Sequence, residues 1–479
     1  MNRGVAKRDV VIAALALTHA VVACVWLHSV RFDDAFISFR YGENLALGRG
    51  MVFNVGERVW GATTLLWVLV AAIAHRVVGH ATTPAVMACI GCVAWSAQTL
   101  IARAVLRRLG FDRAADVAAV FLALGMAESF TWVAMETNLV FDVALAAVLA
   151  ALCERYCLAA AFAAVAIVGR PDMIVPAALV AALAAGRLRA RAWKPLVVGL
   201  VMLAPAVLLL WSAGGPLPRS AVVKYGFVGA PAYFVHELAV VPAEILAAMT
   251  ATTPPTWAAW GGLIVWPIVF LGAAALVRRD RRAAVLPLWA ILHLAAYLIW
   301  RPLPGQVWHL YAPIAVGVMF FAVGLIEIQS RFAHARLVNR IAAPAVIGAF
   351  ALLALLRTVA FAKFDQHAVF WFEPRNAAYV SAARIIHASA REGDVVAAGE
   401  VGTLAYYSDE RVEDWNGLVN EQKPLVAALA SGHPGRVRWI VGWAPGDVAY
   451  FRKTLVGHAP FVYSFPTQHK SIYVFDLLE

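Results

Sequence analysis

The chain has 479 residues, of which 62% are hydrophobic and 14% are charged. Ordinary soluble domains are about 45–50% apolar and about 25% charged, so this composition excludes a water-soluble globular protein and indicates that most of the chain lies in a bilayer. The net charge of +11 does not indicate a nucleic-acid partner, because residues 1–363 carry 30 basic against 16 acidic side chains and residues 364–479 carry 10 against 13. The basic excess belongs to the membrane part, where Lys and Arg set the topology.

Apolar runs predict a mainly α, polytopic membrane helix bundle of about 11 spans in residues 1–363, each of about 20 residues. The predicted spans are 10–30, 84–102, 115–132, 138–153, 157–169, 172–186, 194–212, 257–277, 283–300, 309–328 and 341–361. Basic residues cluster at alternate ends of these runs, at 3–8, 103–113, 155, 187–194, 278–282 and 331–340. By the positive-inside rule, we expect a multi-pass protein of the bacterial inner (cytoplasmic) membrane with its N-terminus in the cytoplasm.

Residues 62–78 are apolar enough to span the membrane, but counting them as a span would break the charge pattern. We therefore interpret this stretch as an amphipathic or re-entrant helix at the outer interface. It then belongs to a first outer loop at residues 31–83, and residues 213–256 form a second long outer loop.

The polar tail, residues 364–479, predicts a small α/β domain outside the cytoplasm. Strand-like runs at 394–399, 438–443, 461–465 and 471–477 accompany helical stretches at 377–391 and 421–430. All five cysteines lie in or beside apolar runs before this domain, so no disulfide framework is expected in it. Cys89 and Cys92 are interpreted as packing residues of a helix, with redox or metal chemistry as the alternative.

Ionisable and amide side chains gather at the predicted outer turns. They are Asp33, Asp34, Arg40, Asn54, Glu57 and Arg58 in the first loop, and further along Glu136, Asn138, Arg170, Asp172, Lys224 and His309. A transporter more often places such groups near the bilayer midplane. Their position favours a site at the outer interface, for a substrate whose tail lies in lipid and whose head projects outward. We expect them to converge on a single pocket.

The sharpest local signal is the acidic pair Asp33 and Asp34. It could cap the start of an interfacial helix, or it could supply a general base at the membrane boundary, where partial desolvation raises the proton affinity of a carboxylate. If the segment is helical, Asp33 and Arg40 share a face about two turns apart. That spacing would place a base near an attacking hydroxyl and a guanidinium, which binds two phosphate oxygens, near a leaving phosphate.

The other candidate residues also have structural alternatives. These are interfacial snorkelling for Arg170 and Lys224, turn capping for Glu136 and Asp172, a surface ion pair for Glu57 and Arg58, and interfacial aromatic packing for His309. The functional interpretation therefore rests on the gathering of these residues on one face rather than on any single position.

The first-loop pattern resembles that of polytopic GT-C glycosyltransferases, and most closely that of AftB-type terminal arabinofuranosyltransferases and their uncharacterised bacterial relatives. The resembling segments are Asp33–Tyr41, Asn44–Ala46, Val52–Asn54, Gly56–Val59, Leu66–Trp67, Met135–Leu139, Arg170–Asp172, Lys224, His309–Pro313 and Gly399–Asp409. The resemblance therefore runs from end to end of the chain, and the first-loop pattern is its most specific part.

This resemblance implies a GT-C-like fold and an inverting sugar transfer from a polyprenyl monophosphate donor to a cell-envelope glycan, lipid or protein acceptor. It implies that an Asp of the acidic pair is the general base, which by position is Asp33 with Asp34 as its neighbour. The cations Arg40, Arg58, Arg170 and Lys224 are then the expected donor-phosphate contacts. The expected substrate contacts are Asn54, Glu57, Glu136, Asn138, Asp172 and His309.

The chain departs from the family pattern at Trp60 and Ala62, where an acidic and an aromatic residue are usual, and at Asp172, where Glu is usual. The sugar is therefore left open among arabinofuranose and other pentoses or hexoses. A divalent metal (Mg²⁺, Mn²⁺ or Ca²⁺) is also left open, because no cluster has the ligand count of an all-protein site. The alternatives to an enzyme are a transporter or flippase of a lipid-linked or anionic solute and a non-catalytic membrane scaffold.

Overall fold

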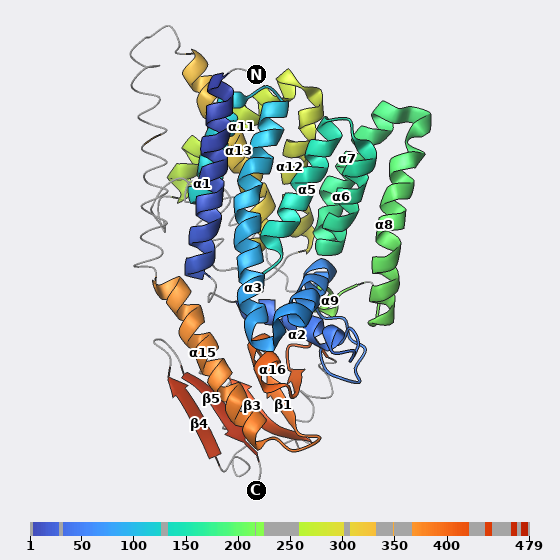
Figure 1. Cartoon of the computed structure of the whole chain (residues 1–479), viewed down its shortest axis with the longest axis vertical. Helices are drawn as coiled ribbons and strands as arrows, with labels where there is room; N and C mark the ends of the chain where they lie inside the picture. Colours follow the sequence, from blue (N-terminus) through green and yellow to red (C-terminus); the bar gives the residue numbers. More distant parts are fainter. Residues whose placement is uncertain are drawn as a thin grey trace. The chain divides into compact units, whose positions relative to one another are not determined.

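The computed structural model describes residues 3–27, 32–125, 133–215, 217–224, 258–300, 307–331, 348, 366–420, 436–442, 461–466 and 471–477. The chain divides into two compact units (Figure 1). Unit 1 is Met1–Leu27, Cys89–Pro205 and Tyr225–Asp365, and unit 2 is His28–Ala88, Ala206–Lys224 and Gln366–Glu479. The helices α3 (Leu65–Arg108) and α8 (Trp193–Ser212) contribute residues to both units.

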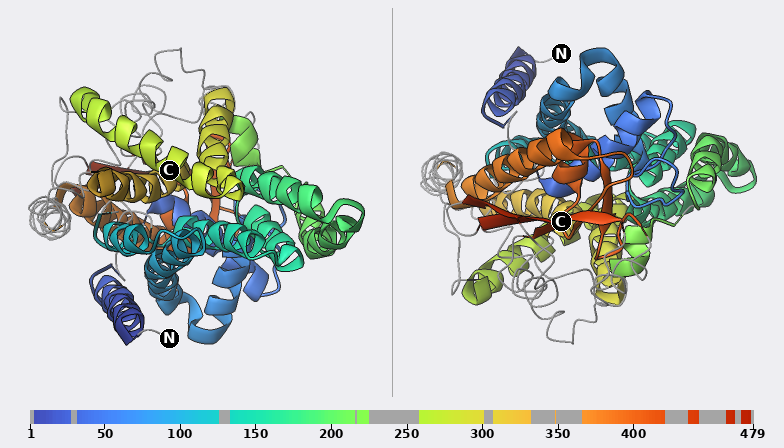
Figure 2. Two further views of the ribbon diagram at one scale, coloured as in Figure 1. Left: turned by 90° about the horizontal axis from the view of Figure 1, so that it is seen from above. Right: turned by 90° about the horizontal axis from the view of Figure 1, so that it is seen from below.

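Unit 1 is helical in its described part. Besides its shares of α3 and α8, it contains α1 (Arg3–Leu27), α4 (Asp112–Gly125), α5 (Thr137–Leu152), α6 (Tyr156–Gly169), η2 (Pro171–Met173), α7 (Ile174–Leu188), η3 (Arg189–Arg191), α11 (Ala258–Arg279), η4 (Arg281–Ala284), α12 (Val285–Trp300), η5 (Val307–Leu310) and α13 (Tyr311–Arg331). The helices α5, α6 and α7 lie side by side in Figure 1, and Figure 2 (left) views them nearly end-on.

Small residues allow close helix packing in this unit. A Cβ at Gly272 of α11 would lie 1.9 Å from the carbonyl oxygen of Phe320, and a Cβ at Gly324 of α13 would lie 2.1 Å from that of Ile268. The two backbones therefore approach closely at both glycines, as is common where helices associate in a bilayer.

Within the described residues, five helices are long and apolar enough to cross a membrane. They are Arg8–Trp26, Leu65–Arg108, Pro171–Arg191, Trp193–Ser212 and Tyr311–Arg331, with α5 and α6 as shorter apolar helices. Every predicted span between residues 10 and 328 overlaps a helix, whereas the predicted span 341–361 lies almost wholly outside the described residues. These predicted segments are confirmed as helices, whereas the number of about 11 membrane spans stays a prediction.

The segment 62–78, interpreted as an interfacial helix, forms the first part of α3. The helix runs for 44 residues but is interrupted at Gly79, whose φ of 76° and ψ of 174° are not helical. A positive φ favours glycine because a Cβ would be strained there. Just after this bend, the hydroxyl of Thr83 donates to the carbonyl of Gly79 at 2.8 Å. A helix in this segment is confirmed, and its interfacial position stays a prediction.

Unit 2 combines helices with a five-stranded sheet of order β2-β1-β3-β5-β4. Its elements are α2 (Asp33–Ala46), the first part of α3, the end of α8, α9 (Arg219–Lys224), α15 (Gln366–Ser389), β1 (Val395–Ala398), α16 (Gly402–Ser408), β2 (Arg411–Asp414), β3 (Val437–Gly442), β4 (Phe461–Pro466) and β5 (Ser471–Asp476). The strand β1 pairs in parallel with β2 and β3, whereas β5 pairs antiparallel with β3 and β4. The helix α15 packs against β4 and β5 (Figure 2, right).

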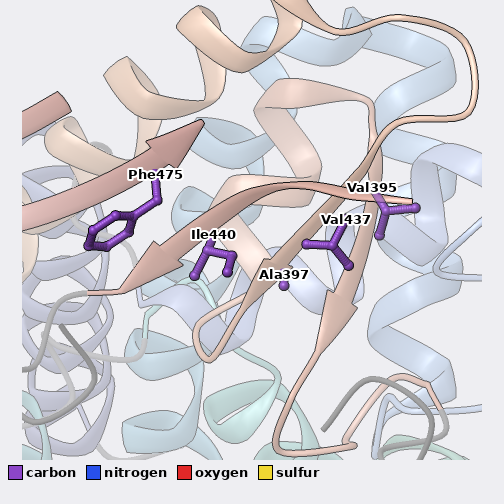
Figure 3. Close-up of a cluster of buried hydrophobic side chains, with 5 residues drawn as sticks. All are labelled: Val395, Ala397, Val437, Ile440 and Phe475. Carbon is purple, nitrogen blue, oxygen red and sulfur yellow. The ribbon is translucent and has the colours of Figure 1, made fainter. Parts of the chain in front are cut away.

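The sheet core explains why the tail strands were readable from the sequence. Val395, Ala397, Val437, Ile440 and Phe475 form one buried cluster (Figure 3), and every residue of β1 and β3 is buried, as is typical of central strands. The four predicted strands are confirmed as β1, β3, β4 and β5, and the helix predicted at 377–391 is confirmed within α15. The helix predicted at 421–430 lies outside the described residues, and neither β2 nor α16 was predicted.

Candidate active site

The acidic pair occupies the first turn of α2, after Phe32 in an extended conformation. Asp33 is buried with 4% of its surface exposed, and Asp34 is partly exposed. The Asp33 carboxylate accepts hydrogen bonds from the backbone N–H of Thr403 at 2.8 Å and of Gly402 at 3.1 Å. Asp33 therefore does not cap its own helix but holds the first turn of α16, through charge-assisted bonds to both of its oxygens.

Gly402 allows this contact to form. A Cβ at this position would lie 2.1 Å from the carbonyl oxygen of Asp33 and 3.1 Å from the backbone nitrogen of Ile37. Only hydrogen fits between the two backbones, so the start of α16 lies directly against the start of α2. The orientation of the Asp33 carboxylate is fixed by main chain rather than by mobile side chains.

Two further carboxyl groups, the partly buried Glu400 and the buried Asp414, interact electrostatically with Asp33. Burial raises the pKa of Glu400 to about 7, and the charge of Asp33 adds to the rise, although Arg375 binds Glu400 at 2.9 Å and acts against it. Burial also raises the pKa of Asp414 to about 6, despite the backbone N–H groups of Leu418 and Asn416 that bind its carboxylate. These carboxyl groups therefore hold protons at higher pH than ordinary acids do.

Arg40 lies two turns along α2 from Asp33 and is buried in a network of carboxylates. Its guanidinium pairs with Asp409, with Glu43 at 3.3 Å and with the carbonyl of Phe53 at 3.3 Å. Burial alone would raise the pKa of Asp409, but the charge of Arg40 and the hydrogen bonds from Arg40 and Arg49 outweigh it and hold that pKa below its ordinary value. A phosphate that binds Arg40 would therefore have to displace one of these partners.

Two of the remaining first-loop residues, Asn54 and Glu57, bind residues of β2. The Asn54 amide exchanges two hydrogen bonds with the backbone of Val412, at 2.9 and 3.1 Å, and also donates to Glu57 at 3.1 Å. Glu57 forms its ion pair with Arg411, so the surface pair with Arg58 considered from the sequence is not the one the structure shows. Arg58 itself is exposed.

Lys224 is the last residue of α9, and its side chain lies outside the part that the structure describes.

In unit 1, three of the predicted site residues surround the buried guanidinium of a fourth, Arg170. Arg170 binds Asp172 through two nitrogens, both at 3.1 Å, Glu136 at 3.3 Å and the Nδ1 of His309 at 3.0 Å. It also donates to the hydroxyl of Tyr297 at 3.1 Å. Every nitrogen of the guanidinium therefore has a partner, and two carboxylates outweigh its single charge.

Aromatic rings complete this cluster. The Tyr297 hydroxyl donates to Asp172 at 2.6 Å, and Nε2 of His293 lies 3.1 Å from the carbonyl of His309. Arg170, Asp172, His293 and His309 line a small pocket together with Tyr311 and neighbouring apolar residues.

Asn138 has a different environment in unit 1. Its side chain is buried and donates to the carbonyl of Gly91 at 3.3 Å, where a Cβ on Gly91 would collide with the carbonyl of Val133. This position joins α3 to α5.

The structure adds residues that the sequence did not single out as site residues. Glu400 and Asp409 lie within the resembling segment Gly399–Asp409, so that segment carried a usable signal. Arg375 lies in α15, and Tyr297 and His293 lie in an apolar run of α12, where no local pattern sets them apart. The one described group of three side chains able to share a metal ion is Glu43, His75 and His80.

This chain resembles known proteins in its fold more than in its sequence. Residues 369–470 match the family model of a domain of unknown function (DUF8728), which covers less than half of the chain. No curated protein matches the chain. The solved structure of ArnT from Cupriavidus metallidurans in the apo state is similar at a TM-score of 0.62 and 15% identity, over 98% of this chain and 98% of that one.

Two ligand-bound structures are similar as well. ArnT from Cupriavidus metallidurans bound to undecaprenyl phosphate matches at a TM-score of 0.60 and 15% identity, over 98% of this chain and 97% of that one. The archaeal oligosaccharyltransferase AglB from Archaeoglobus fulgidus, in complex with an inhibitory peptide and a dolichol-phosphate, matches at a TM-score of 0.55 and 13% identity. The match covers 97% of this chain and 74% of that one. The chain is thus a membrane protein with an ArnT-like fold, mainly helical with a small C-terminal sheet.

Proposed function

We propose that this protein is a GT-C membrane glycosyltransferase that transfers a sugar from a polyprenyl monophosphate donor to a cell-envelope glycan, lipid or protein acceptor. The observation that carries the proposal is the fold likeness to ArnT over nearly the whole of both chains, since that fold is also known with undecaprenyl phosphate bound. The first-loop resemblance supports the same class independently. The reaction takes place at the outer face of the inner membrane, among membrane lipids that hold the prenyl chain.

Asp33 is the proposed general base, with Asp34 as its neighbour. A base must hold a fixed position relative to the attacking hydroxyl, and the N–H groups of Gly402 and Thr403 give Asp33 that fixed orientation. Each carboxylate oxygen retains a second lone pair that can accept the acceptor's hydroxyl proton. Glu400, whose pKa of about 7 leaves it partly protonated at neutral pH, then limits the negative charge around Asp33.

The donor phosphate is the proposed partner of Arg40, Arg58, Arg170 and Lys224. Arg58 is exposed and needs no rearrangement, whereas Arg40 and Arg170 must exchange a carboxylate for a phosphate oxygen. Such an exchange keeps the guanidinium charge-paired and supplies stabilisation as the leaving group develops charge. Asn54, Glu57, Glu136, Asn138, Asp172 and His309 remain proposed substrate contacts, and for Asn54 and Asn138 the described bonds also support a purely structural role.

Donor class is tested directly by the lipids that accompany the protein. The full chain is purified in a mild detergent, and extracted lipids are analysed by mass spectrometry for polyprenyl-phosphate sugars. Purified protein in nanodiscs is then supplied with polyprenyl-phosphate pentoses and hexoses, and release of free polyprenyl phosphate is measured. Release that depends on the protein supports the proposal, and transport of an intact lipid-linked solute without cleavage would replace it with the flippase alternative.

The base is tested by Asp33→Asn with Asp34→Asn as its matched neighbour. We expect Asp33→Asn to lower sugar transfer by at least about 10²-fold, the lower end of general-base contributions. Gly402 and Thr403 donate to different oxygens of Asp33, and in Asn one of these positions becomes an NH2 donor, so the same variant should also unfold more easily, by about 1–3 kcal/mol. Activity is therefore compared at a temperature where both variants are folded. Full activity of Asp33→Asn there would remove it as the base.

A further inference from the structure

Glu43, His75 and His80 bring three metal-ligating side chains together away from the Asp33 carboxylate. One ligand atom of each lies within 4.8 Å of the others, and the Glu43 and His80 atoms are 2.8 Å apart. We propose that these three residues form a binding site for a zinc-class divalent transition-metal ion. Zinc binds such atoms at about 2.0–2.2 Å, so the three side chains would close on the ion from these separations.

The bend in α3 creates this arrangement. In a regular helix, residues 75 and 80 would be about 140° apart around the axis and would not face a common point. The left-handed conformation of Gly79 interrupts the helix between them, and the two imidazole rings lie with their centroids 6.3 Å apart. The third ligand, Glu43, comes from α2, so the site joins α2 to both sides of the bend.

Each ligand has a feature that suits it to an ion. Nδ1 of His75 is buried without a hydrogen-bond partner in the described structure, which is costly unless something else binds it. Oε2 of Glu43 is held by Arg40 at 3.3 Å, and Oε1 faces Nδ1 of His80 at 2.8 Å, so an ion bound by this pair would replace the proton between them. The ring of His80 stacks on Tyr406 at 4.2 Å, and the Tyr406 hydroxyl donates to the His80 carbonyl, so this imidazole is oriented. Outer partners of this kind commonly fix metal ligands.

The ligand set selects the class of ion. Two imidazoles and one carboxylate suit zinc and similar transition ions, whereas magnesium and calcium prefer oxygen ligands. Three protein ligands leave a fourth tetrahedral position open to water or to an anionic group. Arg40, Arg49 and Arg76 place positive charge around the site, so we expect modest affinity rather than the tight binding of a Cys-rich structural site.

Metal content of the full chain tests the site without any assay of activity. The protein is purified with a tag that lacks histidine, stripped with EDTA, dialysed against buffered zinc and analysed by inductively coupled plasma mass spectrometry. We expect about one zinc ion per chain in the wild type. Its loss is expected in His75→Ala, a variant that should fold because His75 Nδ1 makes no hydrogen bond in the described structure. Glu43→Gln and His80→Ala should lose the ion as well.

His387→Ala is the matched control, because His387 is an exposed histidine of the same unit and belongs to no such group of three. This variant should keep its zinc and, like the wild type, should gain thermal stability when zinc is added. Equal zinc binding by the wild type and His75→Ala, or no zinc in the wild type after dialysis, would overturn the proposal. Replacement of zinc by magnesium at equal concentration would overturn its transition-metal class.

Discussion

The two clusters of candidate residues, one around Asp33 and one around Arg170, differ in the sign of the charge at their centre and in the groups that bind it. Around Asp33 in unit 2, the pKa values of Glu400 and Asp414 are raised, and main-chain N–H groups hold the Asp33 carboxylate. Around Arg170 in unit 1, a single buried guanidinium is surrounded by two carboxylates and aromatic or imidazole groups. The first cluster contains carboxyl groups with raised pKa values, whereas the second is a network of hydrogen bonds around one guanidinium.

This difference shows why chemical type alone does not assign a role. Arg170 and Arg40 have the residue type expected of phosphate contacts, yet both already have carboxylate partners. A buried pair of this kind contributes little net stability while intact, but removing one partner leaves an uncompensated charge. Asp33, in contrast, is bound by neutral donors, so its negative charge remains available for chemistry.

The largest effect is expected from Arg170→Ala. It would leave the buried Glu136 and the largely buried Asp172 without their cation, which costs about 3–5 kcal/mol. Thermal unfolding of the protein in nanodiscs measures the loss. The double variant Arg170→Ala, Asp172→Ala should recover part of it, because fewer unpaired charges remain. Arg155→Ala, at an exposed position of the same unit, is the control that should change little. Unchanged stability of Arg170→Ala would mean that the cluster is not charge-coupled.

A smaller but still clear effect is expected from Gly402→Ala. The new Cβ would force apart α2 and α16 at the carbonyl of Asp33, and overpacking of this kind costs about 1–3 kcal/mol. Gly186→Ala is the matched control, since nothing lies within 4 Å of a Cβ there and alanine favours its helix. The unfolding temperature of each variant is measured. Equal stability of Gly402→Ala and the wild type would contradict the close backbone contact.

The smallest effect is a pH dependence introduced by Glu400. Its pKa in the folded protein is about 7, above the ordinary value of 4.5, so the folded state binds more protons than the unfolded chain between these values. Stability contributed by Glu400 is therefore complete below about pH 4.5 and is lost as pH rises through about 7.

Glu400→Gln cannot lose a proton, so its unfolding temperature relative to the wild type should rise across this window, by the equivalent of about 1 kcal/mol for each pH unit. The exposed Glu392→Gln should show no such trend when both are scanned from pH 5 to 8. A difference between Glu400→Gln and the wild type that stays constant with pH would show that Glu400 is ionised throughout.

Much of the fold could be read from the sequence because membrane helices and buried strands depend on local composition. Apolar runs predicted the helices of unit 1, and alternating or continuous apolar residues predicted β1, β3, β4 and β5. The strand β2 escaped prediction because its sequence Arg-Val-Glu-Asp is mostly charged, and it forms where the Asn54 amide and β1 supply partners. The site residues of unit 1 were recognised individually, but their hydrogen bonds to one another and to Tyr297 required the packing of α12 and η5.

The sequence by itself determined that this is a polytopic membrane protein with a small sheet domain, and that an acidic pair opens a helix with an arginine on the same face. These features follow from composition and helical periodicity, which act over a few residues. Only the tertiary structure decided that Asp33 binds Gly402 and Thr403 and that Arg40 binds Asp409, because hydrogen bonds between residues more than 300 positions apart leave no local pattern.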